Sequence, residues 1–374
     1  MSRRILIVAG EASGDAQAAE LAAAMLAADP GLDIFGVGGP RMREAGVRVA
    51  IDCAELSVMG FAELGGRLAR IWAAYRELAD AIRHHPPDLV VLVDYPDFNL
   101  RLARVARRAG VPVFYYVSPQ VWAWRRGRIR KIARLVDRMV VLFPFEVDLY
   151  RAHGVDVHFV GHPLAERVSA TRSAESTRAR YGLALDRPAV ALLPGSRRRE
   201  VDALLPVMLQ AAERLLGKVS FAVSCAPGLE KAVVARHVER ARVPVALVEG
   251  DTYNLLAACD VAAVASGTAT VECALLGVPM VVVYRMSALS YAIARALVRV
   301  PYVAMPNLLL GEAVVPELIQ RRASAEGLAT ALRRYLDDPR LREQVSARLA
   351  DVRSALVRPG AAGRAARLAL ELAR

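Results

Sequence analysis

One carboxylate stands at the end of an apolar run, where it would suit proton transfer. Asp94 follows Leu89–Val93, five consecutive apolar residues that predict a buried strand. At the rim of a buried sheet, desolvation and local dipoles tune the pKa of a carboxyl group for general-base work. Asp94 is therefore the candidate base. An ordinary helix cap is the alternative explanation, and it fits Asp97 better, because a helical pattern begins beside that residue.

A turn with two glycines follows the first apolar run, Ile5–Ala9. Residues 10–15 read GEASGD, at a point where a strand would pass into a helix. A plain turn capped by Ser13 or Asp15 explains the pattern, but the carboxylate of Glu11 favours a sugar hydroxyl and would repel a phosphate. No Gly-x-Gly-x-x-Gly and no Walker loop occurs there, so dinucleotide-binding and NTP-hydrolysing functions lose their main support.

Two small-residue turns in the second half of the chain suit a diphosphate. The first turn, residues 195–197 (GSR), follows the apolar run Val190–Leu193, and residues 265–272 (ASGTATVE) follow Val261–Val264. Glycine lets the backbone approach a ligand, a helix amino terminus offers free amides, and Arg197 adds a permanent charge. Glu272 has the reach for a ribose diol. For the second turn alone, a helix cap with a solvated acid explains the residues equally well.

Two tryptophans stand beside a basic run between residues 118 and 134. Trp122 and Trp124 precede a run of arginines, a combination that stacks nucleic-acid bases or holds an anionic amphiphile. The alternative is a solvated helix face, because residues 129–136 carry apolar side chains at helical spacing.

His162 is the one histidine that directly follows a predicted strand, Val157–Val160. An imidazole at this position either faces a leaving phosphate or is held by packing alone. The remaining histidines and the four cysteines show no metal-ligand spacing, and no Asp-x-Asp pair occurs. We expect no metal site.

The elements that must position these residues alternate along the whole chain. Short β-branched runs separate longer helical patterns, which predicts parallel sheets built from βαβ units. In such folds ligands bind outside the carboxyl ends of the strands, where the turns described above lie. The strands expected are Ile5–Ala9, Ile34–Val37, Leu89–Val93, Val113–Val117, Met139–Leu142, Val157–Val160, Val190–Leu193, Ser220–Ser224, Ala246–Val248, Val261–Val264 and Met280–Tyr284.

Length and patterning together predict two domains. A chain of 374 residues holds two domains of about 150 residues or more. The polar stretch between Leu164 and Pro188 carries no strand signal. We therefore expect an α/β fold with doubly wound parallel sheets at residues 1–165 and 166–345, and a helical tail at 346–374 that packs across the domains.

The composition of the chain indicates a cellular compartment but does not identify a binding partner. Fifty Lys and Arg against 38 Asp and Glu give a net charge of +12, which favours acidic partners. Only three of these cations are lysines, so codon bias accounts for much of the arginine content. The four dispersed cysteines suit a reducing compartment. The first apolar run is too short for a signal peptide, and no apolar stretch reaches about 18 residues, so we expect a cytoplasmic protein without a spanning helix.

Taken in order, the motifs resemble one family, the lipid-A-disaccharide synthases, which are glycosyltransferases of the GT-B fold. The most specific stretch is YVSPQVWAWR at residues 116–125. Two departures are small: Ala12 stands where many relatives carry threonine, and Tyr95 occupies a variable position. Residues after about 320 match weakly. The other matching stretches are residues 9–15, 38–42, 58–60, 94–99, 142–146, 193–197, 266–272 and 306–309.

The resemblance implies an inverting transfer in lipid A biosynthesis, in a cleft between two Rossmann-like domains. The enzyme would move 2,3-diacylglucosamine from UDP to the 6-hydroxyl of 2,3-diacylglucosamine 1-phosphate and release UDP, without a cofactor. Asp94 would take the acceptor proton, with Glu11 as the alternative base, and Arg197 with fixed amides would stabilise the leaving diphosphate. The implied substrate-binding residues are Gly10, Glu11, Ser13, Gly14, Asp15, Gln120, His162, Gly195, Ser196, Arg197, Ser266, Gly267, Thr268, Ala269, Glu272 and Asn307.

Acylated substrates give a purpose to an amphipathic stretch in the first half. Apolar and basic side chains there would lie on anionic lipid, at the cytoplasmic face of the inner membrane. A core-facing helix with polar edges is the alternative. The residues concerned are Val58–Phe61, Leu64, Arg67, Leu68, Arg70, Ile71, Trp72 and Arg76.

Three further possibilities stay open. Another UDP-GlcNAc-type transferase or an epimerase would use the same fold. A basic nucleic-acid-binding protein would use residues 122–134, although the resemblance points to lipid and sugar partners and not to nucleic acid. An oligomer is possible.

Overall fold

The computed structural model describes residues 2–56, 64–119, 121–124, 127–288, 291, 292, 295, 298 and 300–373. The chain divides into two compact units, Met1–Pro163 with Arg358–Arg374, and Leu164–Val357. Residues 346–374, expected as one tail, are divided between the units. Helix α18 (Pro339–Leu356) belongs to the second unit, and α19 (Ala361–Leu370) returns to the first. Gln120 and Val58–Phe61 lie outside the described residues.

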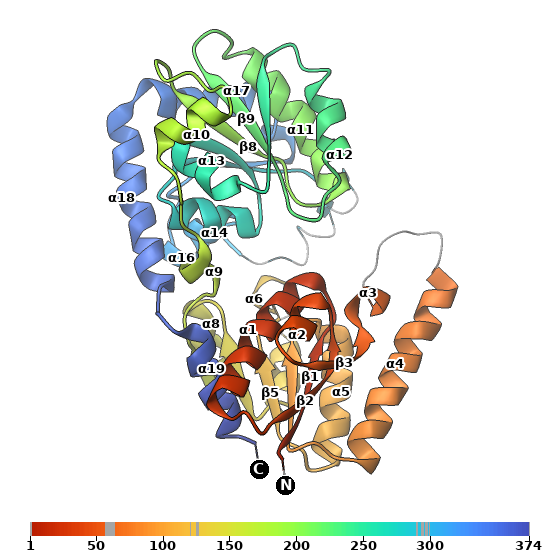
Figure 1. Ribbon diagram of the computed structural model, residues 1–374. Helices are drawn as coiled ribbons and strands as arrows, with labels where there is room; N and C mark the ends of the chain where they lie inside the picture. The colour runs from red at the N-terminus through yellow and green to blue at the C-terminus, as the bar shows by residue number, and fades with distance from the viewer. Residues whose placement is uncertain are drawn as a thin grey trace. The chain divides into compact units, whose positions relative to one another are not determined.

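The first unit is built on a seven-stranded sheet in the order β3-β2-β1-β4-β5-β6-β7 (Figure 1). All neighbouring strands pair in parallel. The strands are β1 (Arg4–Ala9), β2 (Asp33–Gly38), β3 (Arg48–Asp52), β4 (Leu89–Val93), β5 (Val113–Tyr116), β6 (Arg138–Val141) and β7 (Val157–Phe159).

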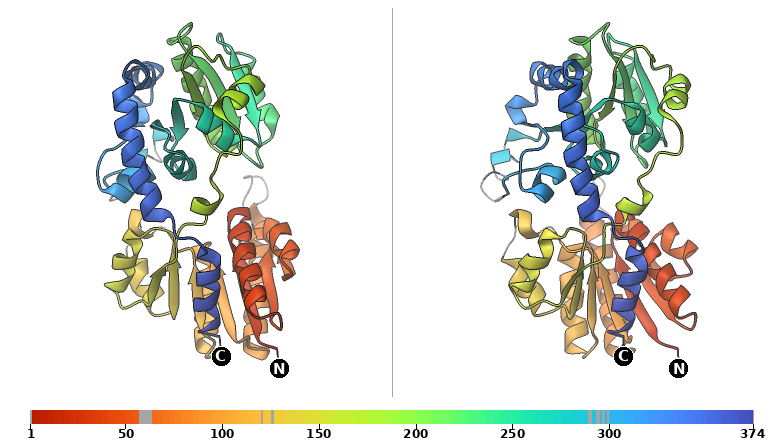
Figure 2. Two further views of the ribbon diagram at one scale, coloured as in Figure 1. Left: turned by 60° about the vertical axis from the view of Figure 1, so that its left-hand side comes forward. Right: turned by 90° about the vertical axis from the view of Figure 1, so that its left-hand side faces the viewer.

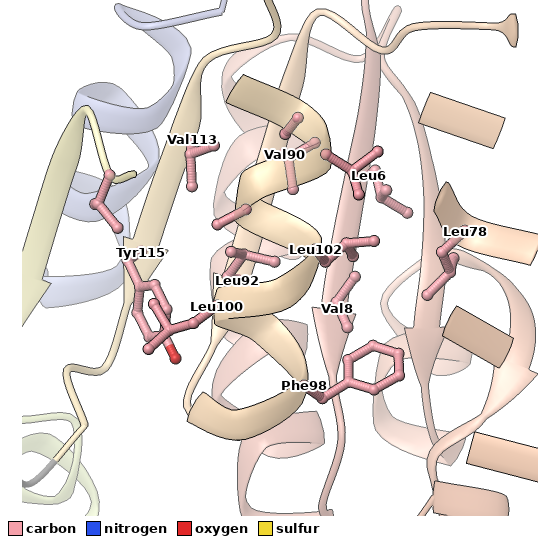
Figure 3. Packing of buried hydrophobic residues seen from close by; sticks show 14 of the residues in the cluster. Leu6, Val8, Leu78, Val90, Leu92, Phe98, Leu100, Leu102, Val113 and Tyr115 are labelled. Atoms are coloured by element: carbon pink, nitrogen blue, oxygen red, sulfur yellow. The ribbon is translucent and has the colours of Figure 1, made fainter. Parts of the chain in front are cut away.

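Helices cover both faces of this sheet, which explains why its central strands are apolar throughout. All five residues of β4 are buried. One face packs on α4 (Leu64–His84) and α5 (Pro96–Arg108), as Figure 3 shows for Leu78 and Phe98. The other face packs on α1 (Ala12–Ala28) and α19, which lie side by side in Figures 1 and 2. The shorter helices are α2 (Pro40–Glu44), α3 (Cys53–Leu56), α6 (Val121–Trp124), α7 (Arg128–Ala133) and α8 (Phe145–Arg151).

The second unit contains a six-stranded parallel sheet in the order β10-β9-β8-β11-β12-β13. Its strands are β8 (Ala189–Leu193), β9 (Ser220–Cys225), β10 (Val245–Glu249), β11 (Val261–Ala265), β12 (Met280–Tyr284) and β13 (Glu317–Ile319). Its helices are α9 (Leu164–Arg167), α10 (Ala174–Arg180), α11 (Arg198–Glu213), α12 (Lys231–Val238), α13 (Thr252–Ala258), α14 (Thr268–Leu275), α16 (Met305–Leu310), the 3-10 turn η1 (Gln320–Arg322), α17 (Ala325–Asp337) and α18.

Two parallel α/β sheets confirm the expected fold class, and every expected strand is present within about two residues. The sequence reading missed β3 and β13. Both are edge strands. Only Ile51 is buried in β3, and β13 has three residues, so neither carries the long apolar run that marks a central strand.

Each sheet reverses its strand order at one place, between β1 and β4 in the first unit and between β8 and β11 in the second. Loops leaving the carboxyl ends of strands at such a switch point diverge to opposite faces and leave a crevice that binds ligands. The four predicted site turns follow these four strands. No described helix has the length and apolar character needed to cross a membrane.

Candidate active site

In the first unit, Asp94 and Gly10 leave the sheet next to one another. The last residues of their strands, Ala9 in β1 and Val93 in β4, are paired in register. A Cβ on Gly10 would lie 2.4 Å from the ring of Tyr95, so only glycine leaves room for that ring. The first switch point thus brings together the two predicted motifs at residues 10–15 and 94–99.

The backbone at Asp94 has an unusual conformation. Asp94 and Tyr95 both have left-handed φ angles, 46° and 44°, which side chains with a Cβ rarely adopt. Tyr95 is the N-cap of α5 and Asp97 lies in the first turn of that helix, so the prediction that Asp97 caps it is wrong. The carboxylate of Asp97 instead pairs with Arg128.

The carboxyl group of Asp94 has the properties of a base poised near neutral pH. Burial, and secondly the negative charge of Glu11, raise the pKa of Asp94 to about 6. Both effects disfavour the charged form. A base with this pKa is ionised at neutral pH and still binds a proton more strongly than an ordinary aspartate does.

The other predicted residues of the turn after β1 divide into two groups. Glu11 and Ser13 are exposed. Gly14 is buried, and a Cβ added to it would contact Ala9 and Val93. Asp15 is also buried, and its carboxylate accepts three backbone N–H bonds at the start of α2, from Gly39 (2.6 Å), Arg41 (3.1 Å) and Met42 (3.1 Å). Its oxygens therefore hold α2 in place.

His162 is buried at the end of the first unit. Its ring lies 5.2 Å from that of Phe143, at an angle of 47°. This ring contact fits the packing explanation of the histidine.

A second buried carboxylate, Glu146, was missed by the sequence analysis. It accepts hydrogen bonds from the Ser118 hydroxyl (2.5 Å), the Trp122 indole (3.1 Å) and the Phe143 backbone N–H (3.0 Å). Burial raises its pKa to about 7 against these three donors. Glu146 thereby ties the turn after β5 to the turn after β6. The conspicuous stretch LFPFE at residues 142–146 was the available signal, but nothing in it identified the partners.

In the second unit, the turn after β8 already holds an anionic oxygen. Glu200 Oε2 accepts the backbone N–H groups of Ser196 (3.0 Å) and Arg197 (3.3 Å), and the Arg197 guanidinium contacts Oε1 at 3.2 Å. Gly195 has φ 114° and no room for a Cβ beside Glu200. Backbone amides and an exposed arginine converging on one carboxylate are donors of the kind that binds phosphate oxygens.

The turn after β11 is also glycine-dependent. Gly267 is the exposed N-cap of α14 with φ 140°, and an added Cβ there would meet open space. The Ser266 hydroxyl donates to the carbonyl of Val303 (3.0 Å). Thr268 is exposed and Ala269 half-buried. The start of this helix is therefore accessible to solvent.

Glu272 lies one turn into α14 and is half-buried. The Tyr253 hydroxyl donates to its carboxylate at 3.1 Å. Burial raises the pKa of Glu272, although the Tyr253 bond and the charge of Arg167 oppose that shift. Sequence reasoning identified Glu272 but not Tyr253, which comes from α13.

Asn307 is fully buried, and its amide is committed to the protein. Nδ2 donates to the carbonyl of Val315 (2.9 Å) and to Glu317 (3.0 Å), while Oδ1 accepts the Val315 N–H (2.9 Å). These bonds anchor α16 to the segment before β13. Within the described part of the chain, no group of three or more His, Cys, Asp or Glu side chains could hold a metal ion.

The sequence has close counterparts among characterised families. A family model described as lipid-A-disaccharide synthetase matches residues 5–369. The chain is 47% identical to the lipid-A-disaccharide synthase of Geobacter metallireducens, over 99% of this chain and 97% of that one. It is 48% identical to the enzyme of that name from Syntrophus aciditrophicus, over 99% and 98%.

Solved structures extend the likeness in fold to more distant proteins. Acinetobacter baumannii MurG superposes with a TM-score of 0.61 at 16% identity, covering 99% of this chain and 100% of that one. A UDP-GlcNAc 2-epimerase from Neisseria meningitidis, bound to UDP-GlcNAc, gives 0.62 at 12% identity, with 98% of each chain covered. These identities are low enough that the likeness concerns the fold alone.

Proposed function

Because the chain belongs to the lipid-A-disaccharide synthase family, we propose that Asp94 is the general base of its reaction and that the turns after β8 and β11 bind UDP. The family activity is transfer of 2,3-diacylglucosamine from UDP to the 6-hydroxyl of 2,3-diacylglucosamine 1-phosphate. The family match over residues 5–369 confirms the expectation, drawn from the motifs, that the chain is a glycosyltransferase of lipid A biosynthesis.

An inverting transfer needs one base and one stabilised leaving group. The acceptor oxygen attacks the anomeric carbon as the bond to the diphosphate breaks, so the acceptor proton must leave and negative charge grows on UDP. Asp94 takes the proton. The observation that carries this assignment is a half-buried carboxyl group at the β1–β4 switch point, with a pKa raised to about 6.

UDP binding is supported by the donors of the second unit. The amides of Ser196 and Arg197 bind the Glu200 carboxylate. For the diphosphate to bind these amides beside the Arg197 guanidinium, the Glu200 side chain must turn away, because the two anions repel each other. The exposed start of α14 supplies further amides, and Glu272 accepts the ribose hydroxyls. Charge that grows on the diphosphate during departure strengthens these bonds in the transition state.

The direct test is an assay with both acylated substrates. The protein, incubated with UDP-2,3-diacylglucosamine and 2,3-diacylglucosamine 1-phosphate, should form one disaccharide 1-phosphate for each UDP released. UDP release without disaccharide, or isomerisation of the UDP-sugar, would contradict the transferase assignment and point to the hydrolase or epimerase chemistry available to this fold.

The substrates are amphiphiles, and α4 supports contact of the enzyme with an anionic membrane surface, on the cytoplasmic face of the inner membrane. Trp72 on this helix is 45% exposed. Its ring stacks on Tyr75 at 5.1 Å, and the Arg76 guanidinium lies 5.4 Å from the ring centroid. An exposed, rigidly held tryptophan beside an arginine suits the headgroup region of a bilayer.

Co-sedimentation with vesicles of phosphatidylethanolamine and phosphatidylglycerol tests this contact. Trp72→Ser should reduce the bound fraction several-fold, and added salt should reduce binding of the unaltered protein. Leu185→Ser, at a 63% exposed leucine in the second unit, is the matched control and should leave binding unchanged. Equal loss in both variants, or none in Trp72→Ser, would exclude α4 as the contact.

A further inference from the structure

The left-handed backbone at Asp94 needs a cause, because two successive residues with a Cβ hold φ angles of 46° and 44°. Conformations of this kind persist only when the surroundings impose them. Part of the restraint acts on Tyr95, whose hydroxyl donates to the Leu56 carbonyl (3.2 Å) and whose own carbonyl accepts the Asn99 N–H (3.0 Å). The stronger restraint acts on the peptide carbonyl of Asp94 itself.

Two buried side chains donate to that carbonyl. The Tyr115 hydroxyl lies 2.6 Å from it and Asn99 Nδ2 lies 2.8 Å from it. Both side chains are 0% exposed. They come from different elements, β5 and α5, so the carbonyl is clamped from the neighbouring strand and from the following helix.

The amide nitrogen of Asn99 points toward carbonyl oxygens at the strand ends. Nδ2 also approaches the carbonyl of Val93 (3.2 Å) and that of Val8 (3.5 Å). Its Oδ1 is buried without a hydrogen-bond partner among the described residues. A buried orphan acceptor is unfavourable, and its retention here indicates that the donor is needed where it points.

The Tyr115 hydroxyl is equally difficult to explain by packing. Its ring lies among apolar side chains, including Leu92 and Leu100 (Figure 3). Phenylalanine would fill the same space, and a buried hydroxyl is costly unless it is bonded. The hydroxyl donates to the carbonyl of Asp94 at 2.6 Å, and it is also hydrogen-bonded to the side chain of Asn99, the other residue that holds this carbonyl.

We propose that Tyr115 and Asn99 are positioning residues, which aim the Asp94 carboxylate at the acceptor hydroxyl by fixing the carbonyl of the same residue. The inference rests on the proposed role of Asp94 as the base. Both side chains are fully buried, so they act through Asp94 and not by contact with substrate. Loss of either side chain is therefore expected to lower the rate of proton transfer and to leave substrate binding unchanged.

The test compares Tyr115→Phe with a matched control, Tyr116→Phe. Tyr116 is the next residue of β5 and equally buried, but its side chain lies in the core cluster on the opposite face of the sheet. Tyr115→Phe should lower kcat about tenfold, the effect of losing roughly one hydrogen bond, with both KM values within about twofold. Tyr116→Phe should leave kcat within about twofold. Equal kcat losses in the two variants, or none in Tyr115→Phe, would overturn the proposal.

A double-mutant cycle separates positioning from general damage to the fold. In an Asp94→Asn background there is no base to aim, so Tyr115→Phe should cause no further loss of the residual rate. A further tenfold loss there would show that Tyr115 acts independently of Asp94. Asn99→Ala should behave like Tyr115→Phe in the same cycle, with thermal unfolding confirming that each variant folds.

Failure of the inference is distinguishable from failure of the base assignment. If Asp94→Asn keeps near-normal turnover, Asp94 is not the base and the proposed function is wrong at that residue. If Asp94→Asn loses turnover while Tyr115→Phe and Asn99→Ala do not, the base assignment survives and only the positioning role is overturned.

Discussion

At Asp94 two physical effects act in the same direction. Burial removes water from the carboxylate, and the Glu11 charge repels it, so both raise the pKa, to about 6. The group must be ionised to accept a proton. Activity is therefore expected above the raised pKa and is lost as the pH falls through it.

This reasoning predicts the pH dependence of kcat/KM. The value should fall about tenfold per pH unit below pH of about 6. In Glu11→Gln the second cause is removed, and the break should move to lower pH. A break at the same pH in both proteins would show that the ionising group does not experience the Glu11 charge. The measurement is a rate profile between pH 4.5 and 8, with folding checked at each end by circular dichroism.

The position of Asp94 could be predicted from the sequence because the pattern that indicates it is local. Asp94 follows five apolar residues, and that pattern alone placed it at the rim of the sheet. Asp15 and Asn307 also lie in the first turns of helices. Their hydrogen-bond partners, however, lie at least 24 and at least 8 residues away in the sequence, respectively. No local pattern indicates that a carboxylate or amide is already satisfied by such partners.

Among the elements, α2 depends on one buried carboxylate. This helix spans five residues, too few to stabilise itself, and its first N–H groups are bonded to Asp15. Helix α2 is therefore anchored from the turn after β1.

Asp15→Asn should destabilise the protein markedly. It replaces a charged acceptor of three N–H bonds by an amide that has one oxygen, at an expected loss of about 3 kcal/mol in the free energy of unfolding. Chemical denaturation measures this loss. Ser13→Ala, two residues earlier and exposed, is the control and should change stability by less than about 0.5 kcal/mol. A loss below about 1 kcal/mol in Asp15→Asn would show that α2 is held by other contacts.

The elements themselves were largely predictable, because central parallel strands are apolar on both faces and end in turns. The edge strands β3 and β13 lack that double burial and left no comparable signal. The network around Glu146 was not predictable either, since its three donors come from two separate turns. Pairing of this kind depends on the order of the strands, which the sequence pattern does not state.

In the whole molecule, the chain returns to its first unit at the carboxyl end. The helix α19 packs small side chains against α1, through Ala361, Ala365 and Ala366 among others. Arg364 donates to the carbonyl of Val160, and Arg138 donates to that of Leu368 at 2.9 Å. The carboxyl-terminal tail, which the family model matches to residue 369, thus completes the core of the unit that carries Asp94.

Deletion of residues 358–374 tests that role. The first unit should unfold at a lower temperature, because the face of α1 that α19 covers becomes exposed, while the second unit should keep its melting temperature. Calorimetry, with limited proteolysis to identify the unit that opens first, measures both. An unchanged transition for the first unit would show that α19 contributes nothing to its core.

The central claim is that Asp94 removes the acceptor proton. Its most direct test is kcat for Asp94→Asn at saturating concentrations of both acylated substrates, beside Asp97→Asn, an isosteric change at a 78% exposed side chain in the same motif. The account predicts that kcat falls about a thousandfold in Asp94→Asn, with UDP affinity and folding retained, and changes less than about threefold in Asp97→Asn. A kcat for Asp94→Asn within tenfold of the unaltered enzyme would contradict it.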